Sequence, residues 1–263
     1  MADDKNKKTL KTMQDDVKNI PARKASANLR RNGRYRVTIN GVAVKYEVKD
    51  GKAILLGIPE SVEGAFDIPS TLGGHPVTEI WPNAFSNCAG LTSVTIPDSV
   101  TNIGDEAFRD CDGLTSVTIP NSVTNIGYQA FEECCGLTSV TIPDSVTRIG
   151  PWAFANCCDL TSVTIPDSVA VIGHEAFAGC CGLMSMTIPD SVAVIGDEAF
   201  KGCSGLKSVT ICSGATRIGM CAFLNCSGLT SVTIPHSVQA IGIKAFKGCR
   251  NLDSLTRQWL ERH

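Results

Sequence analysis

The chain repeats a 23-residue unit seven times, and this repeat limits what it can fold into. The unit LTSVTIPDSVTNIGDEAFRDCDG begins at Leu91, and LTSVTIPNSVTNIGYQAFEECCG begins at Leu114. Further units begin at Leu137, Leu160, Leu183, Leu206 and Leu229. All seven have Leu at position 1, Ile at 6, Ile-Gly at 13 and 14, Ala-Phe at 17 and 18, and Cys at 21. Because so short a unit buries its apolar side chains only against its neighbours, the sequence predicts a solenoid rather than separate globular domains.

Each unit is predicted to form one coil that crosses the core twice. Alternating apolar residues predict a short strand over residues 92–96, and Pro97 ends it. Val100 and Ile103 then return the chain to the core on the other side.

The rest of the unit is predicted to be a turn. We expect Gly104 to adopt a turn conformation that a side chain would strain, and residues 105–108 to form a short helical turn with Phe108 inward. Eight coils at about 4.8 Å per strand would give a parallel ladder roughly 35–40 Å long. The predicted fold is a leucine-rich repeat solenoid, curved and horseshoe-like, with a parallel β ladder and short helical or irregular convex segments.

The ends of the chain differ from the repeats and are predicted to form caps. Residues 1–31 form a basic arm, either a disordered tail or a short amphipathic helix. Residues 32–65 are predicted to be a β-hairpin or meander, because Asn-Gly and Asp-Gly pairs separate three strand-like runs. The solenoid spans residues 66–251, with a longer, irregular first coil, and residues 252–263 are predicted to form a helical C-terminal cap.

Charge and hydropathy exclude two classes of binding protein. The 24 Lys+Arg against 26 Asp+Glu give a net charge of -2, too small for nucleic-acid or membrane binding by bulk charge. The charge is uneven, since residues 1–36 carry 11 basic and 4 acidic groups and the remainder carries 13 and 22. We find no apolar run long enough to span a membrane and nothing like an export signal in residues 1–31. Membrane contact is therefore expected only through the basic arm, and the sequence assigns no compartment.

The whole unit L-x-x-V-x-I-P-x-x-V-x-x-I-G-x-x-A-F-x-x-C resembles the repeat of the BspA-like leucine-rich repeat family, found in bacterial and protozoan surface proteins. The resemblance covers about residues 60–255, and the longer IPSTLGGHPVTEI segment is similar to that family's usual first repeat. It implies adhesion or protein recognition at a cell surface, without catalysis. The implied partner is a protein, such as a host or extracellular matrix protein.

The thirteen cysteines are predicted to be structural or free thiols. Cys135, Cys158 and Cys181 share position 22 in successive coils, where the spacing would permit disulfides; free thiols are the favoured interpretation. Eight others share position 21 and are expected to form one buried column of small apolar side chains rather than a metal site. They are Cys88, Cys111, Cys134, Cys157, Cys180, Cys203, Cys226 and Cys249.

No constellation for catalysis or metal binding is found in the repeats. The four histidines fall at unrelated positions, so the repeat generates no His-Cys or His-Asp pair. Aspartates recur at position 8, where we favour ordinary turn chemistry, and calcium binding is the alternative. These are Asp98, Asp144, Asp167 and Asp190. We expect no enzyme activity, metal or cofactor.

Side chains differ between coils mainly at positions 15, 16 and 19, and we call this line the variable ridge. Large apolar groups among variable charges are typical of protein interfaces, while drift at unconstrained positions is the alternative interpretation. The candidate partner-binding residues are Tyr128, Trp152, His174, Met220, Ile243, Arg109, Glu132 and Lys201.

The strand surface, by contrast, hardly varies and is predicted to present a uniform face of hydroxyl groups. Position 5 is Thr in every repeat: Thr95, Thr118, Thr141, Thr164, Thr187, Thr210 and Thr233. Thr favours strands and is soluble, which is the plain interpretation; a repetitive glycan or other polymer is the functional one. The predicted function is non-catalytic protein recognition or adhesion, with a structural or glycan-binding role through this face as the alternative and no nucleic-acid partner.

Overall fold

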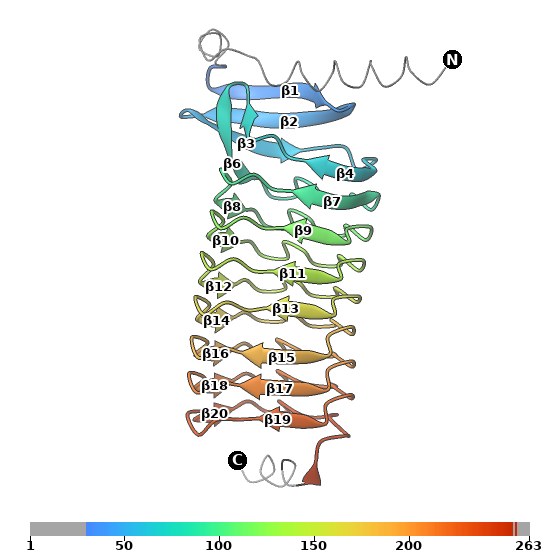
Figure 1. The fold of residues 1–263 in the computed structure, drawn as a ribbon, viewed down its shortest axis with the longest axis vertical. Coiled ribbons are helices and arrows are strands. Elements are labelled where there is room, and N and C mark those ends of the chain that lie inside the picture. Colours follow the sequence, from blue (N-terminus) through green and yellow to red (C-terminus); the bar gives the residue numbers. More distant parts are fainter. Residues whose placement is uncertain (1–29, 255, 257–263) are drawn as a thin grey trace, which may run out of the picture.

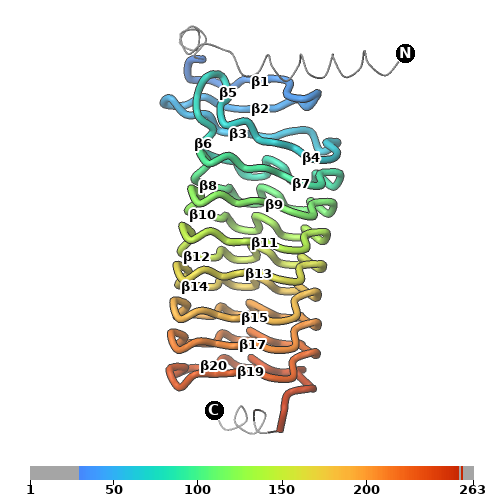
Figure 2. The backbone as a smooth tube through the Cα atoms, in the orientation of Figure 1, coloured from blue at the N-terminus to red at the C-terminus, as the bar shows by residue number. Residues whose placement is uncertain are grey.

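The computed structural model describes residues 30–254 and 256, and its architecture is a parallel β-solenoid. Figure 1 shows two columns of short strands along the molecule, with an N-terminal β cap at one end. The fold class predicted from the repeat is confirmed. In Figure 2 the coils follow a nearly straight column, so the curvature expected of a horseshoe is slight over this length.

The first strand column contains the predicted Ser-Val-Thr strands. It consists of β4 (Gly64–Asp67), β7 (Leu91–Thr95), β9 (Ser116–Thr118), β11 (Ser139–Thr141), β13 (Ser162–Thr164), β15 (Ser185–Ile188), β17 (Ser208–Ile211) and β19 (Ser231–Thr233). Neighbouring strands are parallel, and their register puts equal repeat positions side by side, as in Val94 opposite Val117. The sequence repeat is therefore also the spatial repeat.

The second strand column forms where the chain was expected to return to the core. It consists of β6 (His75–Ile80), β8 (Asn102–Ile103), β10 (Asn125–Ile126), β12 (Arg148–Ile149), β14 (Val171–Ile172), β16 (Val194–Ile195), β18 (Arg217–Ile218) and β20 (Ala240–Ile241). Each of these strands from β8 to β20 contributes one inward Ile, and the preceding residue points outward.

The core is a set of columns, each made by one repeat position. The position-18 phenylalanines from Phe85 to Phe246 form a stack whose ring centroids are 4.7 to 5.5 Å apart and whose planes are nearly parallel. All but the last ring are completely buried. Offset stacked rings add attraction to the burial of apolar area, so the stack ties consecutive coils together.

The cysteine column is buried as predicted, and it makes a contact that the sequence did not reveal. The thiol of Cys111 donates a hydrogen bond to the carbonyl oxygen of Phe85 in the preceding coil, at 3.0 Å. The same bond recurs in each coil up to Cys249, at 3.0 to 3.2 Å. The Phe85 carbonyl also accepts the N–H of Cys88 at 3.2 Å, so the thiol occupies its second acceptor position, which an alanine or valine could not do.

The helical turn predicted for residues 105–108 was wrong, because this segment forms turns. Glu106 has φ 55° and its N–H donates to the carbonyl oxygen of Tyr128 in the next coil, at 2.8 Å. The N–H of Phe108 likewise donates to Ala130 at 2.8 Å. Backbone donors that would close an α-helix are used between coils instead. Phe108 is buried, as expected.

The role predicted for Gly104 was also wrong, although the requirement for glycine is real. Gly104 and its repeat equivalents do not have left-handed φ angles. They lie against the backbone of the preceding coil: a Cβ at Gly127 would be 2.6 Å from the Asp105 nitrogen. Position 14 therefore needs glycine because of close packing between coils rather than because of its own conformation.

The N-terminal cap is the predicted meander of β1 (Gly33–Ile39), β2 (Val42–Lys49) and β3 (Lys52–Gly57). Asn40-Gly41 has φ angles of 50° and 84°, and Asp50-Gly51 has 51° and 76°, as two-residue type I′ hairpin turns require. β3 pairs in parallel with β6, which joins the cap to the solenoid. The long first coil is explained by β5 (Thr71–Leu72), which forms a small hairpin with β6.

Two predictions fall largely on residues that the structure does not describe. The basic arm, residues 1–31, is described only at Arg30 and Arg31. The helical cap predicted for residues 252–263 is described only up to Ser254 and at Thr256, and is not shown.

Candidate functional site

The variable ridge lies on the turn side of the solenoid, outside the Phe and Cys columns. Each coil makes a tight turn there, with φ between 50° and 60° at position 16 in all seven repeats. Positions 17 and 18 are buried Ala and Phe, so the turn directs positions 15 and 16 outward. Because the turns stack in register, equivalent side chains form a line parallel to the long axis.

Three aromatic side chains of the ridge contact one another across successive coils. The rings of Tyr128 and Trp152 are 5.3 Å apart between centroids and meet edge to face at 66°. The rings of Trp152 and His174 are 4.4 Å apart at 83°. Tyr128 is 39% exposed, and Trp152 and His174 are half-exposed. We call these three residues the aromatic cluster.

The cluster depends on a local change of sequence in its middle coil. Tyr128 and His174 occupy position 15, whereas Trp152 occupies position 16, after Pro151. Trp152 has φ 54°, an unusual conformation for a bulky side chain. The stacking imposes it, since the Trp152 N–H donates to the carbonyl oxygen of His174 at 2.9 Å, like every other position 16 up to Cys221.

The acidic residues at position 15 have a structural role. The carboxylate of Asp105 accepts a hydrogen bond from the Tyr128 N–H at 2.8 Å, and Asp197 accepts one from the Met220 N–H at the same distance. Pro151 has no N–H to donate, so Tyr128 in the preceding coil has no such role to fill. This is a physical reason why an aromatic residue is tolerated there.

The C-terminal part of the ridge exposes two more apolar groups. Met220 is 45% exposed and Ile243 is 75% exposed. Cys221, beside Met220, is buried. Asp197 lies between His174 and Met220 along position 15, so these apolar groups are separate from the aromatic cluster.

The charged candidates at position 19 fall into two groups. Glu132 is only 7% exposed, and the structure places it beneath Arg109, whose guanidinium lies 3.1 Å from it. Burial raises the pKa of Glu132, against the opposing effect of Arg109. Arg109 also pairs with Glu106 at 3.3 Å, and this bond raises the pKa of Arg109. Glu132 therefore offers little contact surface, and Arg109 is already engaged.

Lys201, the third candidate at position 19, and His174, at position 15, each have an acidic neighbour on the surface. Lys201 lies 2.5 Å from Glu198, and His174 lies 3.1 Å from Glu175 through its Nε2. Such exposed pairs contribute little to stability, which leaves these side chains available to a partner.

Two exposed residues, Trp81 and Met184, are not among the candidates predicted from the sequence. Trp81 is 43% exposed and stands at position 14 of the first coil, where every later repeat has Gly. Met184 is 62% exposed and replaces the usual Thr at position 2. In both cases the departure from the repeat was the available signal.

The position-5 threonines, the alternative binding surface predicted from the sequence, lie on the outer face of the first strand column. All seven position-5 threonines are exposed, and register pairs place them side by side, as in Thr118 beside Thr95 and Thr210 beside Thr187. Among the described residues, their hydroxyls make no side-chain hydrogen bond. The position-2 hydroxyls differ: that of Thr115 donates to the Thr92 carbonyl at 3.0 Å.

The cysteines at position 22 are free thiols in the structure. The sulfur atoms of Cys135 and Cys158 are 4.0 Å apart, and Cys181 lies one coil further. No group of three or more His, Cys, Asp or Glu residues in the described part of the chain has a metal-binding arrangement. No helix between residues 30 and 256 is long and apolar enough to cross a bilayer.

The repeat pattern and the coil geometry agree with a known family. A family model of the BspA type leucine-rich repeat region matches residues 78–206 and 171–258, with six copies. The chain belongs to the BspA-type leucine-rich repeat family. Leucine-rich repeat solenoids of this type are interaction proteins and are generally non-catalytic.

Solved structures agree with this assignment. The crystal structure of the T. pallidum leucine-rich repeat protein TpLRR is similar, with a TM-score of 0.62 and 26% identity, over 83% of this chain and 92% of that one. The pneumococcal vaccine antigen PcpA has a TM-score of 0.58 at 21% identity, over 84% of this chain and 69% of that one, which shows a shared fold. Among proteins of curated function, none matches this chain.

Proposed function

We propose that this BspA-type solenoid is a non-catalytic adhesion or recognition module that binds a protein partner through the variable ridge. The observation that carries the proposal is the aromatic cluster. Tyr128, Trp152 and His174 form one contiguous, half-exposed group on an otherwise polar surface. Aromatic residues supply the anchors of most protein interfaces, because they bury a large area with few rotatable bonds.

The chemistry around the cluster supports a polar rim. Glu175 lies 3.1 Å from His174 at one end of the cluster, and the Asp105 carboxylate accepts the N–H of Tyr128 at the other. An apolar centre with charged neighbours is the usual arrangement of a non-obligate interface. The implied partner, from the family, is a host or extracellular matrix protein at a cell surface.

Binding to a panel of purified extracellular matrix proteins and immobilised glycans tests the proposal. We expect the Tyr128→Ser/Trp152→Ser variant to lose at least tenfold in affinity for any protein that the native chain binds, because aromatic anchors dominate interface energies. The matched control is Trp81→Ser/Met184→Ser, which removes two exposed large residues elsewhere. Equal losses of affinity in both double variants, or no loss of affinity in Tyr128→Ser/Trp152→Ser, would reject the ridge as the site.

One observation favours a second candidate function. The position-5 hydroxyls are exposed, in register and without side-chain hydrogen bonds in the described residues, so each is available to a ligand that repeats along the axis. A glycan or other polymer would be the partner. The isosteric variant Thr118→Val/Thr141→Val/Thr164→Val should abolish glycan capture if this face binds and leave protein capture unchanged.

A further inference from the structure

The outward face of the N-terminal cap places like charges opposite each other. Arg36 of β1 is the register partner of Lys45 of β2, and Lys49 of β2 is the register partner of Lys52 of β3. Like charges directly opposite in a sheet are destabilising. Among the described residues, no carboxylate forms an ion pair with any of these four side chains.

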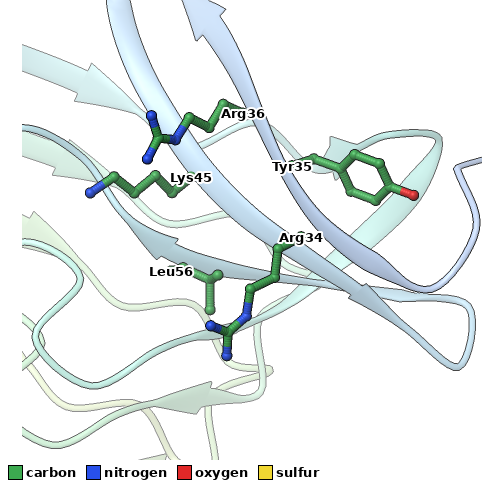
Figure 3. A pocket seen from close by; sticks show the side chains of 5 residues that line it. All are labelled: Arg34, Tyr35, Arg36, Lys45 and Leu56. Atoms are coloured by element: carbon green, nitrogen blue, oxygen red, sulfur yellow. The ribbon is translucent and has the colours of Figure 1, made fainter.

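Each like-charge pair lines an open hollow on the protein surface. The first hollow has a volume of about 460 Å³ and is lined by Arg34, Arg36 and Lys45, with Leu56. In Figure 3 the side chains of Arg36 and Lys45 extend in the same direction, and Arg34 reaches toward Leu56. The second hollow, of about 440 Å³, is lined by Lys49, Lys52 and Trp81, and also by the carboxylates Asp50 and Glu79.

Both pairs lie on one side of the cap sheet. Lys45 and Lys49 are exposed, while Tyr46 and Val48 between them are buried, so the alternation of β2 directs the two lysines to the same face. Four residue steps along the strand put their Cα atoms roughly 13 to 14 Å apart. The face therefore carries two separate basic sites in a line along β2.

The carboxylates near this face leave it positive. Glu47 pairs with Arg34 at 3.1 Å, and Asp50 accepts a weak hydrogen bond from Asn32 at 3.4 Å. Glu79, which lines the second hollow, accepts one from Asn102 at 3.0 Å. Residues 30–57 carry seven basic and two acidic groups, whereas residues 58–263 carry ten and twenty.

We propose that this cap face binds an acidic polysaccharide, with sulfate or carboxylate groups of one chain seated at the two basic pairs. Guanidinium and ammonium groups on both sides of a hollow suit an oxyanion, which would also relieve their mutual repulsion. Two sites this far apart favour a polymer over a single small anion. A bilayer or a nucleic-acid duplex is broad enough to meet the acidic coils as well, whereas a single sugar chain can lie across the cap alone. The site is separate from the variable ridge and does not depend on its function.

Fluorescence anisotropy with a labelled, size-defined heparin oligosaccharide tests the proposal on the full chain. We expect the native protein to bind, with an affinity that falls as salt rises, and Arg36→Ser/Lys45→Ser to weaken binding at least tenfold. Two controls remove the same charge elsewhere: Lys244→Ser/Lys247→Ser in the last coil, and Lys7→Ser/Lys8→Ser in the basic arm. We expect less than a threefold change in each.

Three results would overturn the proposal. Equal losses in all three double variants would mean that bulk charge attracts the heparin, and a loss confined to Lys7→Ser/Lys8→Ser would place the site on the arm. Tighter binding to phosphatidylserine vesicles or to a single-stranded oligonucleotide than to heparin would assign the face to another class of polyanion. Thermal unfolding of each variant distinguishes the loss of a binding site from the loss of the fold. The outcomes do not depend on the ridge experiment, because the two sites are separate.

Discussion

Contacts with the neighbouring coil fix the residue type at positions 14 and 21 of the repeat. Glycine is needed at position 14 because a Cβ at Gly127 would lie 2.6 Å from the Asp105 nitrogen. Cysteine at position 21 satisfies a phenylalanine carbonyl one coil away, as Cys134 does for Phe108 at 3.1 Å. At both positions the repeat preserves a contact between coils rather than a property of one residue.

The substitution Gly127→Ala tests the close approach at position 14. The added methyl group would force two backbones apart, and overpacking of this kind costs about 1 to 3 kcal/mol. Urea denaturation should show that loss, while Thr124→Ala, on the exposed surface of the same coil, should stay within about 0.5 kcal/mol of the native protein. If Gly127→Ala left the free energy of unfolding unchanged, the coils would be able to move apart without loss of stability.

Thiol reactivity tests the burial of the cysteines. Burial raises the pKa of Cys135 to about 11 and that of Cys88 to about 12, so at pH 8 both stay protonated and react slowly. Alkylation followed by mass spectrometry should label the exposed Cys158 and Cys181 first. The nine buried cysteines should be labelled only in denaturant. Early labelling of the position-21 column in the native protein would contradict the packing.

At the scale of the coil, the stacked phenylalanines are the main link between elements. Phe154 lies between Phe131 and Phe177, with ring centroids at 5.3 and 5.5 Å, and is completely buried. Phe246, in the last coil, has one ring neighbour among residues 30–254 and 256 and is only partly buried. The same side chain thus occupies two different environments in one molecule.

This difference predicts unequal effects of one substitution. Phe154→Ala should destabilise the protein by about 3 to 5 kcal/mol, because it removes a large buried ring and leaves a cavity. Phe246→Ala should cost clearly less, since its ring is already partly in solvent. Thermal or urea unfolding of both variants gives the comparison, and equal losses would argue against the stack as the link between coils.

The structure within one coil could be predicted from the sequence, whereas the contacts between coils could not. The strand and the inward Ile and Phe follow from local alternation, which the repeat displays seven times, and the proline stop recurs in six of the seven repeats. The cap hairpins follow from turn chemistry. The turn at residues 105–108 could not be predicted correctly, because its N–H groups bond to the next coil and local propensity does not include that competitor.

The same limit applied to the candidate site. The ridge could be found from sequence because its residues vary while their neighbours repeat. The contact between Tyr128 and Trp152 could not, since these residues occupy different repeat positions and meet only after Pro151 shifts the aromatic group by one residue. The burial of Glu132 under Arg109 likewise depends on two coils at once.

At the scale of the whole molecule, the solenoid has two unequal ends. At the N-terminal end the cap strands pair with the first coil through β3 and β6. At the other end, Leu229, Ala245 and Cys249 of the last coil are buried, but five of its core residues are only partly buried: Val232, Ile234, Val238, Ile241 and Phe246. Solenoid stability is a sum of coil and nearest-neighbour terms, so opening is expected to begin where a neighbour contributes least.

Hydrogen exchange measured by mass spectrometry tests this difference in stability between the two ends of the solenoid. Backbone amides of β19 and β20 should exchange at least tenfold faster than the equivalent amides of β11 and β12 in the middle of the stack. The comparison of β19 with β11 is internally controlled, because both strands have the sequence Ser-Val-Thr. β20 has Ala240 where β12 has Arg148, so for that pair only the Ile amides are compared. Equal protection would mean that the last coil is as well covered as the central ones.

The proposed role of the ridge is tested most directly by hydroxyl-radical footprinting of the native protein with and without a matrix protein that it binds. We predict protection of Tyr128, Trp152, His174 and Met220, with Met184 on the strand face unchanged. Protection of Met184 with no change at the ridge would contradict recognition through the ridge and place the partner on the threonine face.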